Sequence, residues 1–250
     1  MRKSLIGLMV AGVLLGAAQS AYAADYNAGY DGGIMPSTGP KIVLFGGVDA
    51  RERSFYGYGG FVWAPMADLS QDTWLVRGMI GGGSYEYDNP GVVGGEVDGD
   101  HIEGDIMLGY QWHLQPGRFS LYAGLNVQDH DHSPNDPSNS TAGSEAGFKV
   151  QAELESTYGA PFYYNLSGNY STANDTYWTQ ARLGWNMQQF TVGPEVSLAG
   201  NDEYDSQRVG VFARYSMDAF SVTGAVGYAD VSGTQGGDGV YGSLGFSYAY

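Results

Sequence analysis

The 250-residue sequence contains no cysteine, so no disulfide holds the fold together. Basic residues are also scarce: 11 Lys and Arg stand against 27 Asp and Glu, and the net charge is −16. This balance argues against nucleic acid as a partner and against docking on anionic lipid headgroups. After the N-terminal region, no segment has the roughly 18 consecutive apolar residues of a transmembrane helix. Glycine is abundant, with 40 residues, but the sequence lacks the glycine triplet repeat of collagen, which excludes that fold.

The N-terminal residues have the three parts of a secretory signal peptide. Arg2 and Lys3 form a positive region, residues 5–16 form a short apolar core, and Ala21-Tyr22-Ala23 matches an A-x-A cleavage site. We therefore predict a cleaved signal peptide over residues 1–23. An uncleaved membrane anchor is the alternative. Residues 24–40 are rich in Gly and Pro and are interpreted as a flexible N-terminal arm, which leaves 41–250 as the folded domain.

Residues 101–114, HIEGDIMLGYQWHL, show the pattern that recurs along this domain. Every second residue is apolar and the alternate positions are mostly polar, which is typical of a β-strand with one apolar face. The segment is long enough for a tilted strand that spans a membrane, which needs about 9–11 residues. Tyr110 and Trp112 lie near the end of the apolar face, where an aromatic girdle would meet the lipid headgroups.

Similar segments predict an all-β fold, a single closed antiparallel transmembrane β-barrel of about 12 strands. Closure also removes the exposed edges of a long sheet. Pro194 lies inside the ninth segment and weakens that assignment. A soluble β-sandwich or a lipocalin-like barrel is the competing fold, but alternation up to the final Tyr250 looks like the C-terminal insertion signal of outer-membrane barrels. The predicted strands are 41–49, 55–65, 73–87, 101–114, 119–127, 145–155, 162–171, 176–186, 190–199, 207–215, 220–229 and 240–250.

The connections alternate in length. Those at 66–72, 115–118, 156–161, 187–189 and 216–219 are short, whereas the intervening set includes the polar runs 88–100, 129–143 and 230–238. Outer-membrane barrels have short periplasmic turns and longer external loops. The pattern therefore places both termini in the periplasm and the long runs outside the cell.

The lumen face of the predicted strands carries charges of both signs together with aromatic rings. Such side chains can pair and fill a narrow barrel. They can also line a path for a glycan, because sugar C–H faces stack on aromatic rings and carboxylates accept sugar hydroxyls. On this assignment an arginine is expected to be tolerated better at Gln111 or Gln151, on the lumen face, than at Leu108 or Val150. The lumen residues are Tyr58, Arg77, Tyr85, Glu103, Asp105, Tyr122, Glu145, Lys149, Glu153, Tyr163, Trp178, Arg182, Glu195, Arg208, Arg214 and Tyr241.

Four segments, 57–88, 105–114, 121–153 and 193–212, resemble the BcsS family of bacterial cellulose-biosynthesis proteins. The more specific stretches are NVQDHDHSPNDPSN at 126–139 and GPEVSLAGN at 193–201. The resemblance implies a role in cellulose synthesis or secretion in a Gram-negative envelope and supplies no catalytic residues. Nothing in the spacing itself indicates cellulose.

The run 129–143 is predicted to be a surface loop. Asp129, Asp131, Asn135 and Asp136 supply oxygens that a calcium ion could use, but the spacing is not that of an EF-hand and a solvated loop is the alternative. Ser133 next to His132 is the best match to a hydrolase pair, although adjacency in a loop is weak support.

We therefore expect a non-enzymatic accessory protein of cellulose biosynthesis in the outer membrane, without a cofactor. It would export, anchor or organise the polymer. Its expected partners are outer-membrane lipid and cellulose or other envelope components of cellulose synthesis. A small-solute or oligosaccharide channel and a lipid-modifying barrel enzyme are the alternatives. The candidate glycan-contacting residues are Tyr122, Asp129, Asp131, Asn135, Asp136, Tyr163 and Trp178.

Overall fold

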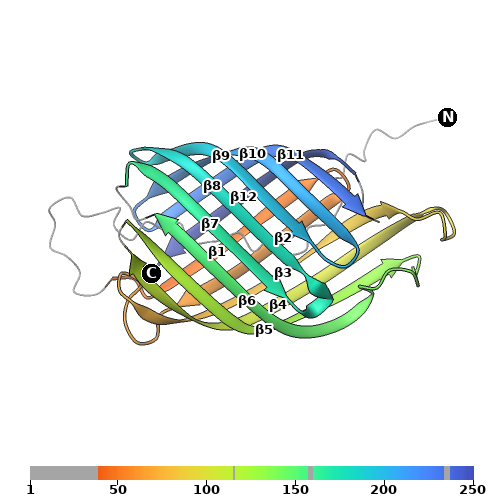
Figure 1. Ribbon diagram of the computed structural model, residues 1–250, viewed down its shortest axis with the longest axis horizontal. Coiled ribbons are helices and arrows are strands. Elements are labelled where there is room, and N and C mark those ends of the chain that lie inside the picture. Colours follow the sequence, from red (N-terminus) through yellow and green to blue (C-terminus); the bar gives the residue numbers. More distant parts are fainter. Residues whose placement is uncertain (1–38, 115, 157–159, 234–236) are drawn as a thin grey trace.

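The computed structural model describes residues 39–114, 116–156, 160–233 and 237–250, which form one closed antiparallel β-barrel (Figure 1). The predicted signal peptide and residues 24–38 of the predicted arm lie outside the described residues. The strands are β1 (Ile42–Arg51), β2 (Ser54–Trp63), β3 (Thr73–Asp88), β4 (Glu96–Leu114), β5 (Gly117–Ser133), β6 (Gly143–Ser156), β7 (Phe162–Ser171), β8 (Tyr177–Met187), β9 (Phe190–Gly200), β10 (Tyr204–Met217), β11 (Phe220–Gly233) and β12 (Gly239–Ala249).

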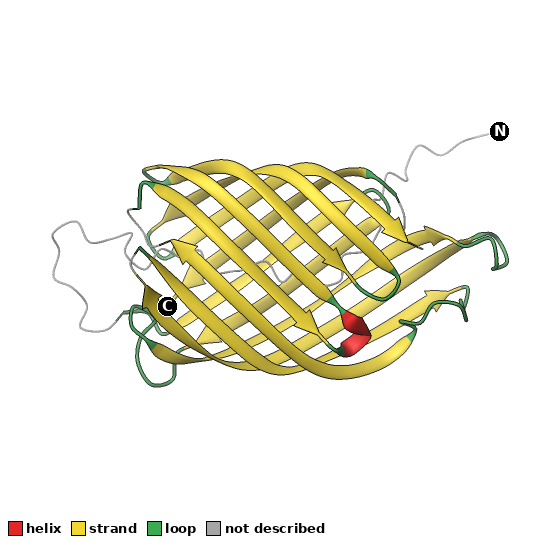
Figure 2. Ribbon diagram, viewed as in Figure 1, coloured by secondary structure: helices red, strands yellow, loops and turns green. Residues whose placement is uncertain are grey.

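Each strand pairs with its neighbours in the sequence, and β1 pairs with β12 to close the barrel. In this last pair Val43 lies opposite Ala249 and Arg51 opposite Tyr241. The described helical structure is one short 3₁₀ turn, η1 (Ala173–Asp175), between β7 and β8 (Figure 2). Within the described ranges, no helix is long and apolar enough to cross a membrane. The prediction of a twelve-stranded all-β barrel is confirmed.

The two ends of the barrel differ. At one end, here called the hairpin end, the β3–β4 and β5–β6 hairpins project beyond the other strands (Figure 1). At the opposite end, the terminal end, β1 begins and β12 ends, and Ile42 and Tyr250 exchange backbone hydrogen bonds. The projection follows from strand length: β3, β4 and β5 have 16, 19 and 17 residues, whereas β1 and β2 have 10 each.

Three predicted loops are shorter in the structure, because the strands beside them are longer than expected. The run 88–100 is reduced to a connection at 89–95, because β4 begins at Glu96. The run 129–143 is reduced to 134–142, because residues 129–133 belong to β5. Strand pairing continues here without apolar residues on the outer face, so the hydrophobic alternation ends before the strand does. The connection 230–238 shrinks in the same way, since β11 extends to Gly233.

Pro194 is accommodated within β9. It lies opposite Val211 of β10, but on its other side the ladder to β8 is interrupted between the pairs Arg182–Glu195 and Trp185–Val192. Proline has no N–H to donate, so a gap in one ladder beside it is the expected consequence. The ninth strand is therefore confirmed despite its proline.

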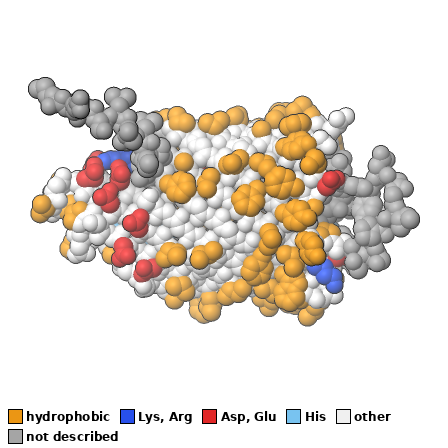
Figure 3. Space-filling view, turned by 180° about the vertical axis from the view of Figure 1, so that it is seen from behind, with side chains coloured by type: hydrophobic (Ala, Val, Ile, Leu, Met, Phe, Trp, Pro, Cys, Tyr) orange, Lys and Arg blue, Asp and Glu red, His pale blue; other side chains and the backbone are white. Residues whose placement is uncertain are grey.

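The outer face carries an apolar belt with aromatic rings toward both of its edges, as expected for a surface that contacts lipid. Figure 3 shows apolar side chains spread over the outer face, most densely toward the terminal end, and acidic side chains gathered toward the hairpin end. Exposed aromatic residues near the terminal end are Trp63, Trp74, Trp112, Phe162, Trp185, Phe190, Phe220 and Tyr248, and those toward the hairpin end are Phe55, Tyr170 and Tyr228.

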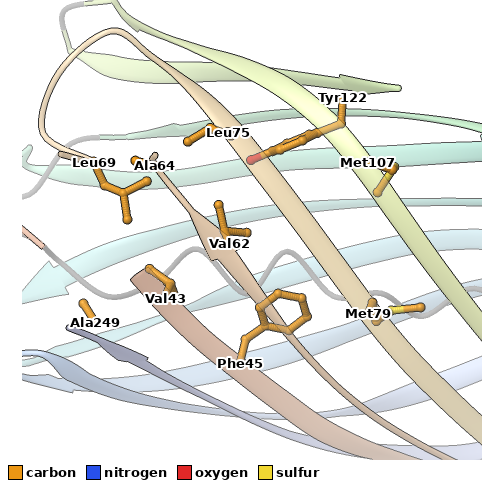
Figure 4. Packing of buried hydrophobic residues seen from close by; sticks show 10 residues of the cluster. All are labelled: Val43, Phe45, Val62, Ala64, Leu69, Leu75, Met79, Met107, Tyr122 and Ala249. Carbon is orange, nitrogen blue, oxygen red and sulfur yellow. The ribbon is translucent and has the colours of Figure 1, made fainter. Parts of the chain in front are cut away.

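The connection between β2 and β3 covers part of the terminal end from within. Its Leu69 is fully buried in a cluster with Val43, Val62 and Leu75 (Figure 4). Gln111 of β4 donates its side-chain amide to the carbonyl oxygens of Leu69 and Gln71, each at 3.0 Å. The cap at this end is thus held by apolar packing and by hydrogen bonds to its backbone.

Candidate functional site

The charged residues of the lumen face pair with one another across strands. Asp105 of β4 binds Arg77 of β3 at 2.9 Å and Lys149 of β6 at 2.7 Å. On the other side of the barrel, Arg182 of β8 binds Glu195 of β9 at 2.7 Å. All five side chains are buried. The prediction that mixed charges pair inside the barrel is confirmed, with Glu145 as an exception because it lies exposed at the rim.

Some interior contacts join strands that are not neighbours. Arg214 of β10 lies 3.6 Å from the carboxylate of Glu155 on β6, four strands away. Tyr56 of β2 shares a buried cluster with Trp178 and Ala199 of β8 and β9. Because β2 and β8 are six strands apart in a closed ring of twelve, this cluster crosses the full width of the lumen. Side chains therefore occupy the middle of the barrel.

The three aromatic candidates point into the lumen but do not form one site. Tyr122 packs with Met107 and Leu75 in the terminal-end cluster. Tyr163 packs against Phe212, with ring centroids 5.7 Å apart, and donates its hydroxyl to Glu155 at 3.2 Å. Trp178 lies in the cluster that crosses the barrel. Their predicted face is right, and the three rings lie in separate clusters.

The four polar candidates from the predicted loop are separated by strand geometry. Asp129 and Asp131 are on β5, where they face outward, and Asn135 is exposed in the connection 134–142. Only Asp136 is buried. Because these oxygens point in different directions, the structure does not assemble the suggested calcium site. Among the described residues, no three His, Asp or Glu side chains are grouped to hold a metal ion.

Ser133 and His132 are also separated. Successive residues of a strand point to opposite faces. His132 accordingly turns inward and lies 2.5 Å from the hydroxyl of Tyr85, whereas Ser133 is exposed. The suggested Ser–His pair therefore does not form.

The connection 134–142, here called the lid, lies across the hairpin end and is fixed on both sides. On one side Asp136 accepts hydrogen bonds from the Tyr87 hydroxyl and the Asn89 side-chain amide, both at 2.7 Å. On the other side Ser140 donates its backbone N–H and its hydroxyl to Glu203, at 2.8 and 2.5 Å. Since Glu203 lies between β9 and β10, the lid connects opposite parts of the barrel rim.

Hydrogen bonds shape the electrostatics of the lid. Desolvation raises the pKa of Asp136, but donors from Ser138, Tyr87 and Asn89 together lower it, so the net pKa is below the usual range of an aspartate. Ser138 alone donates both its backbone N–H and its hydroxyl, at 2.9 and 2.6 Å. The carboxylate of Asp136 is thus the anion around which the lid is organised.

A column of aromatic rings continues from the lid into the lumen. Tyr87 and Tyr85 of β3 stack at 6.1 Å, and His132 of β5 meets both of them edge-on. Below them, His130 and His101 stack at 5.4 Å with 14° between their planes. The column is defined as Tyr87, Tyr85, His132, His130, His101, Tyr56 and Tyr58. Ring contacts link them, with Tyr85 in contact with both His132 and His130.

Glycine allows part of this column to form. Gly83 of β3 is the register partner of both Tyr56 on β2 and His101 on β4. Tyr56 and His101 stack almost flat, with 2° between their planes and 5.4 Å between centroids, although a whole strand separates them. Sequence reasoning placed Tyr58 and Tyr85 in the lumen but did not identify the column. Residues 56, 58, 85, 87, 101, 130 and 132 all occupy inward-facing positions of the strand alternation, which was the available signal. Only the register between strands shows that these residues lie next to one another.

The barrel is similar in fold to solved outer-membrane proteins. An outer membrane channel from Pseudomonas putida F1 aligns with a TM-score of 0.52 and 12% sequence identity, over 89% of this chain and 99% of the channel. LpxR from Salmonella typhimurium aligns with a TM-score of 0.49 and 11% identity, over 83% and 100% of the two chains. The KdgM porin aligns with a TM-score of 0.46 and 9% identity, over 83% and 99%.

Sequence comparisons identify the family. No curated protein sequence matches the chain. The family model described as cellulose biosynthesis protein BcsS matches residues 43–250, which include every strand from the second residue of β1 to the C-terminus. The family predicted from the sequence is confirmed: the chain belongs to the BcsS family of cellulose biosynthesis proteins, as a closed barrel of the outer-membrane type.

Proposed function

We propose that this barrel is a non-enzymatic accessory protein of cellulose biosynthesis that anchors or organises the polymer at the cell surface through its hairpin end. Family membership supports the link to cellulose. The observation that carries the proposal is the cluster of Tyr56 with Trp178, which crosses the lumen between opposite strands. A lumen occupied in this way favours contact at one end of the barrel over passage of a chain through it.

Strand connections support an external position for the hairpin end. Both described chain ends, at Gly39 and Tyr250, adjoin the opposite end, where two-residue turns join β8 to β9 and β10 to β11. Outer-membrane barrels keep their short turns in the periplasm and their longer loops outside. The lid and the β3–β4 hairpin would then face the surroundings, where secreted cellulose accumulates.

A complemented deletion strain tests the role. Wild type and a variant whose lid, residues 134–142, is replaced by a Gly/Ser linker are compared for cell-bound cellulose, released cellulose and heat-modifiable barrel in the outer membrane. Wild type should retain the polymer, the deletion strain should release more of it, and the lid variant should still assemble as a barrel and retain the polymer. Normal cellulose amount and retention in the deletion strain itself would contradict the proposal.

Planar-bilayer recording separates the anchoring role from an oligosaccharide channel. The contacts across the lumen predict little steady conductance for wild type. A matched variant, Tyr56→Ala with Trp178→Ala, removes the cluster between β2 and β8 and should conduct more. Large steady conductance in wild type that cello-oligosaccharides block would favour the channel instead.

A further inference from the structure

We propose that the lid is displaceable and that Tyr87 and Glu203, together with the rings packed on Tyr87, form a binding site for a neutral glycan beneath it. This inference rests on the proposed function and specifies where and how the polymer is contacted. Every group that would bind the glycan is at present occupied by the lid or packed under it.

The lid differs from the cap at the other end in what holds it. Its buried residues are Asp136, Asn139 and Thr141, all polar, whereas the cap between β2 and β3 buries Leu69 and Ala64 completely. A hydrogen bond contributes little net stability, because water can replace either partner. Apolar burial has no such substitute in water. The lid is therefore the cap that can open while the barrel remains folded.

Hydroxyl and amide groups hold the lid, and a sugar offers the same chemistry. Ser140 places a hydroxyl on Glu203, and Asn139 donates its side-chain amide to the Tyr87 hydroxyl at 3.2 Å. A glycan hydroxyl can donate to Glu203 in place of Ser140, and another can bond the Tyr87 hydroxyl in place of Asn139. The chain can thus exchange lid contacts for glycan contacts without leaving a buried polar group unpaired.

Aromatic rings directly below would supply the stacking surface. Tyr87 is stacked on Tyr85, and the His132 ring meets Tyr87 at 6.1 Å. Within the same column, the Nε2 atom of His130 is buried and has no hydrogen-bond partner among the described residues. A buried polar atom without a partner is unfavourable, so a hydroxyl that reaches it would gain a hydrogen bond.

Charge selects a neutral glycan over an acidic one. The site includes the carboxylate of Glu203, and the neighbouring outer face of the long hairpins carries Asp98, Asp100 and Asp131, all exposed. Asp88 and Glu96 on the same face are paired with Arg53, at 3.1 and 2.9 Å. The whole chain has a net charge of −16. A uronic-acid polymer would meet repulsion here, whereas an uncharged β-glucan would not.

A reversible cross-link tests the inference. The Asn89 amide lies 3.3 Å from the Ser138 hydroxyl, and the protein has no native cysteine, so Asn89→Cys with Ser138→Cys can join the lid to the rim. The full purified barrel in detergent is titrated with cellohexaose in oxidised and reduced form. Each single-cysteine variant is the matched control, and oligogalacturonate is the acidic probe.

The reduced double variant and both controls should bind cellohexaose, oxidation should abolish binding only in the double variant, and oligogalacturonate should bind none of them. Tyr87→Ala should weaken cellohexaose binding about tenfold through loss of stacking. Equal binding by oxidised and reduced forms of the cross-linked variant, or no binding of cellohexaose by wild type, would overturn the inference. Normal cellulose retention in the deletion strain would instead overturn the proposed function, so the two failures are distinguishable.

Discussion

Ile102 of β4 and Asp129 of β5 are register partners, and the outer face of the barrel changes polarity at this pair. On β4 the outward residues are Glu96, Asp98 and Asp100 on one side of Ile102 and apolar residues on the other. Carboxylates do not face hydrocarbon, so the pair marks the boundary of the lipid belt. Beyond it, β4 and β5 continue for several residues into the hairpins that carry the lid.

Arginine substitutions along β4 should follow this boundary. Leu108→Arg, near the middle of the apolar face, should lower the free energy of unfolding by about 2–4 kcal/mol, whereas Ile102→Arg at its edge should lower it by only about 0–1 kcal/mol. Asp100→Arg should have little effect. Urea unfolding in lipid vesicles measures all three. A cost at Asp100 as large as that at Leu108 would mean that the boundary is misplaced.

The faces of the strands were predictable from the sequence, because alternation with period 2 determines which residues point together. The ends of β4 and β5 were not, since apolar alternation reports only the part of a strand that touches lipid. Contacts between residues on opposite sides of the lumen could not be predicted from the sequence either. The cluster that contains Tyr56 and Trp178 depends on the diameter of the closed barrel, which neither strand encodes alone.

The expected tolerance of arginine at Gln111 shows the same limit of prediction from alternation alone. Its predicted lumen face is right, but the side chain is fully buried and binds two carbonyl oxygens of the β2–β3 cap. Gln151 is likewise buried and donates to Glu153. Arginine at either position would have to displace these contacts, a cost that the alternation pattern does not reveal.

Removal of the carboxylate of Asp105 should strongly destabilise the barrel. Asp105→Asn leaves Arg77 and Lys149 buried with less compensating charge, and breaking a buried ion pair on one side costs about 3–5 kcal/mol. Asp131→Asn, on the exposed outer face of β5, is the matched control and should change stability by less than about 0.5 kcal/mol. Urea midpoints for the two variants provide the comparison, and equal midpoints would show that the lumen ion pairs contribute nothing.

Gly83→Ala should disturb the ring column. A Cβ at this position would overlap the backbone carbonyl of Phe55, next to Tyr56, so β2 or β3 would have to shift. Such overpacking costs about 1–3 kcal/mol. Gly104→Ala is the control, because its Cβ would meet only the Met79 carbonyl at an ordinary 3.6 Å. The near-ultraviolet circular dichroism of the tyrosines should change in the first variant and not in the second, and a reversed result would remove the role assigned to Gly83.

Acid should release the lid through Asp136. Because the folded pKa of this carboxyl lies below the unfolded value of 3.8, its contribution is complete above the unfolded value and is lost as the pH falls through the folded pKa. The lid should stay closed from neutral pH down to about pH 4 and open only in stronger acid. A spin label at Ala142→Cys, on an exposed lid residue, should become mobile over that range.

The variant Asp136→Asn distinguishes the effect of this carboxyl on the lid from that of other titratable groups near the lid, among them Glu203, His132 and Asp131. The amide cannot ionise and accepts fewer of the hydrogen bonds from Ser138, Tyr87 and Asn89. The label should therefore already be mobile at neutral pH in this variant and show no further change in acid. A label that stays immobile in the variant, or that loosens near pH 6 in wild type, would mean that Asp136 is not the group that holds the lid closed.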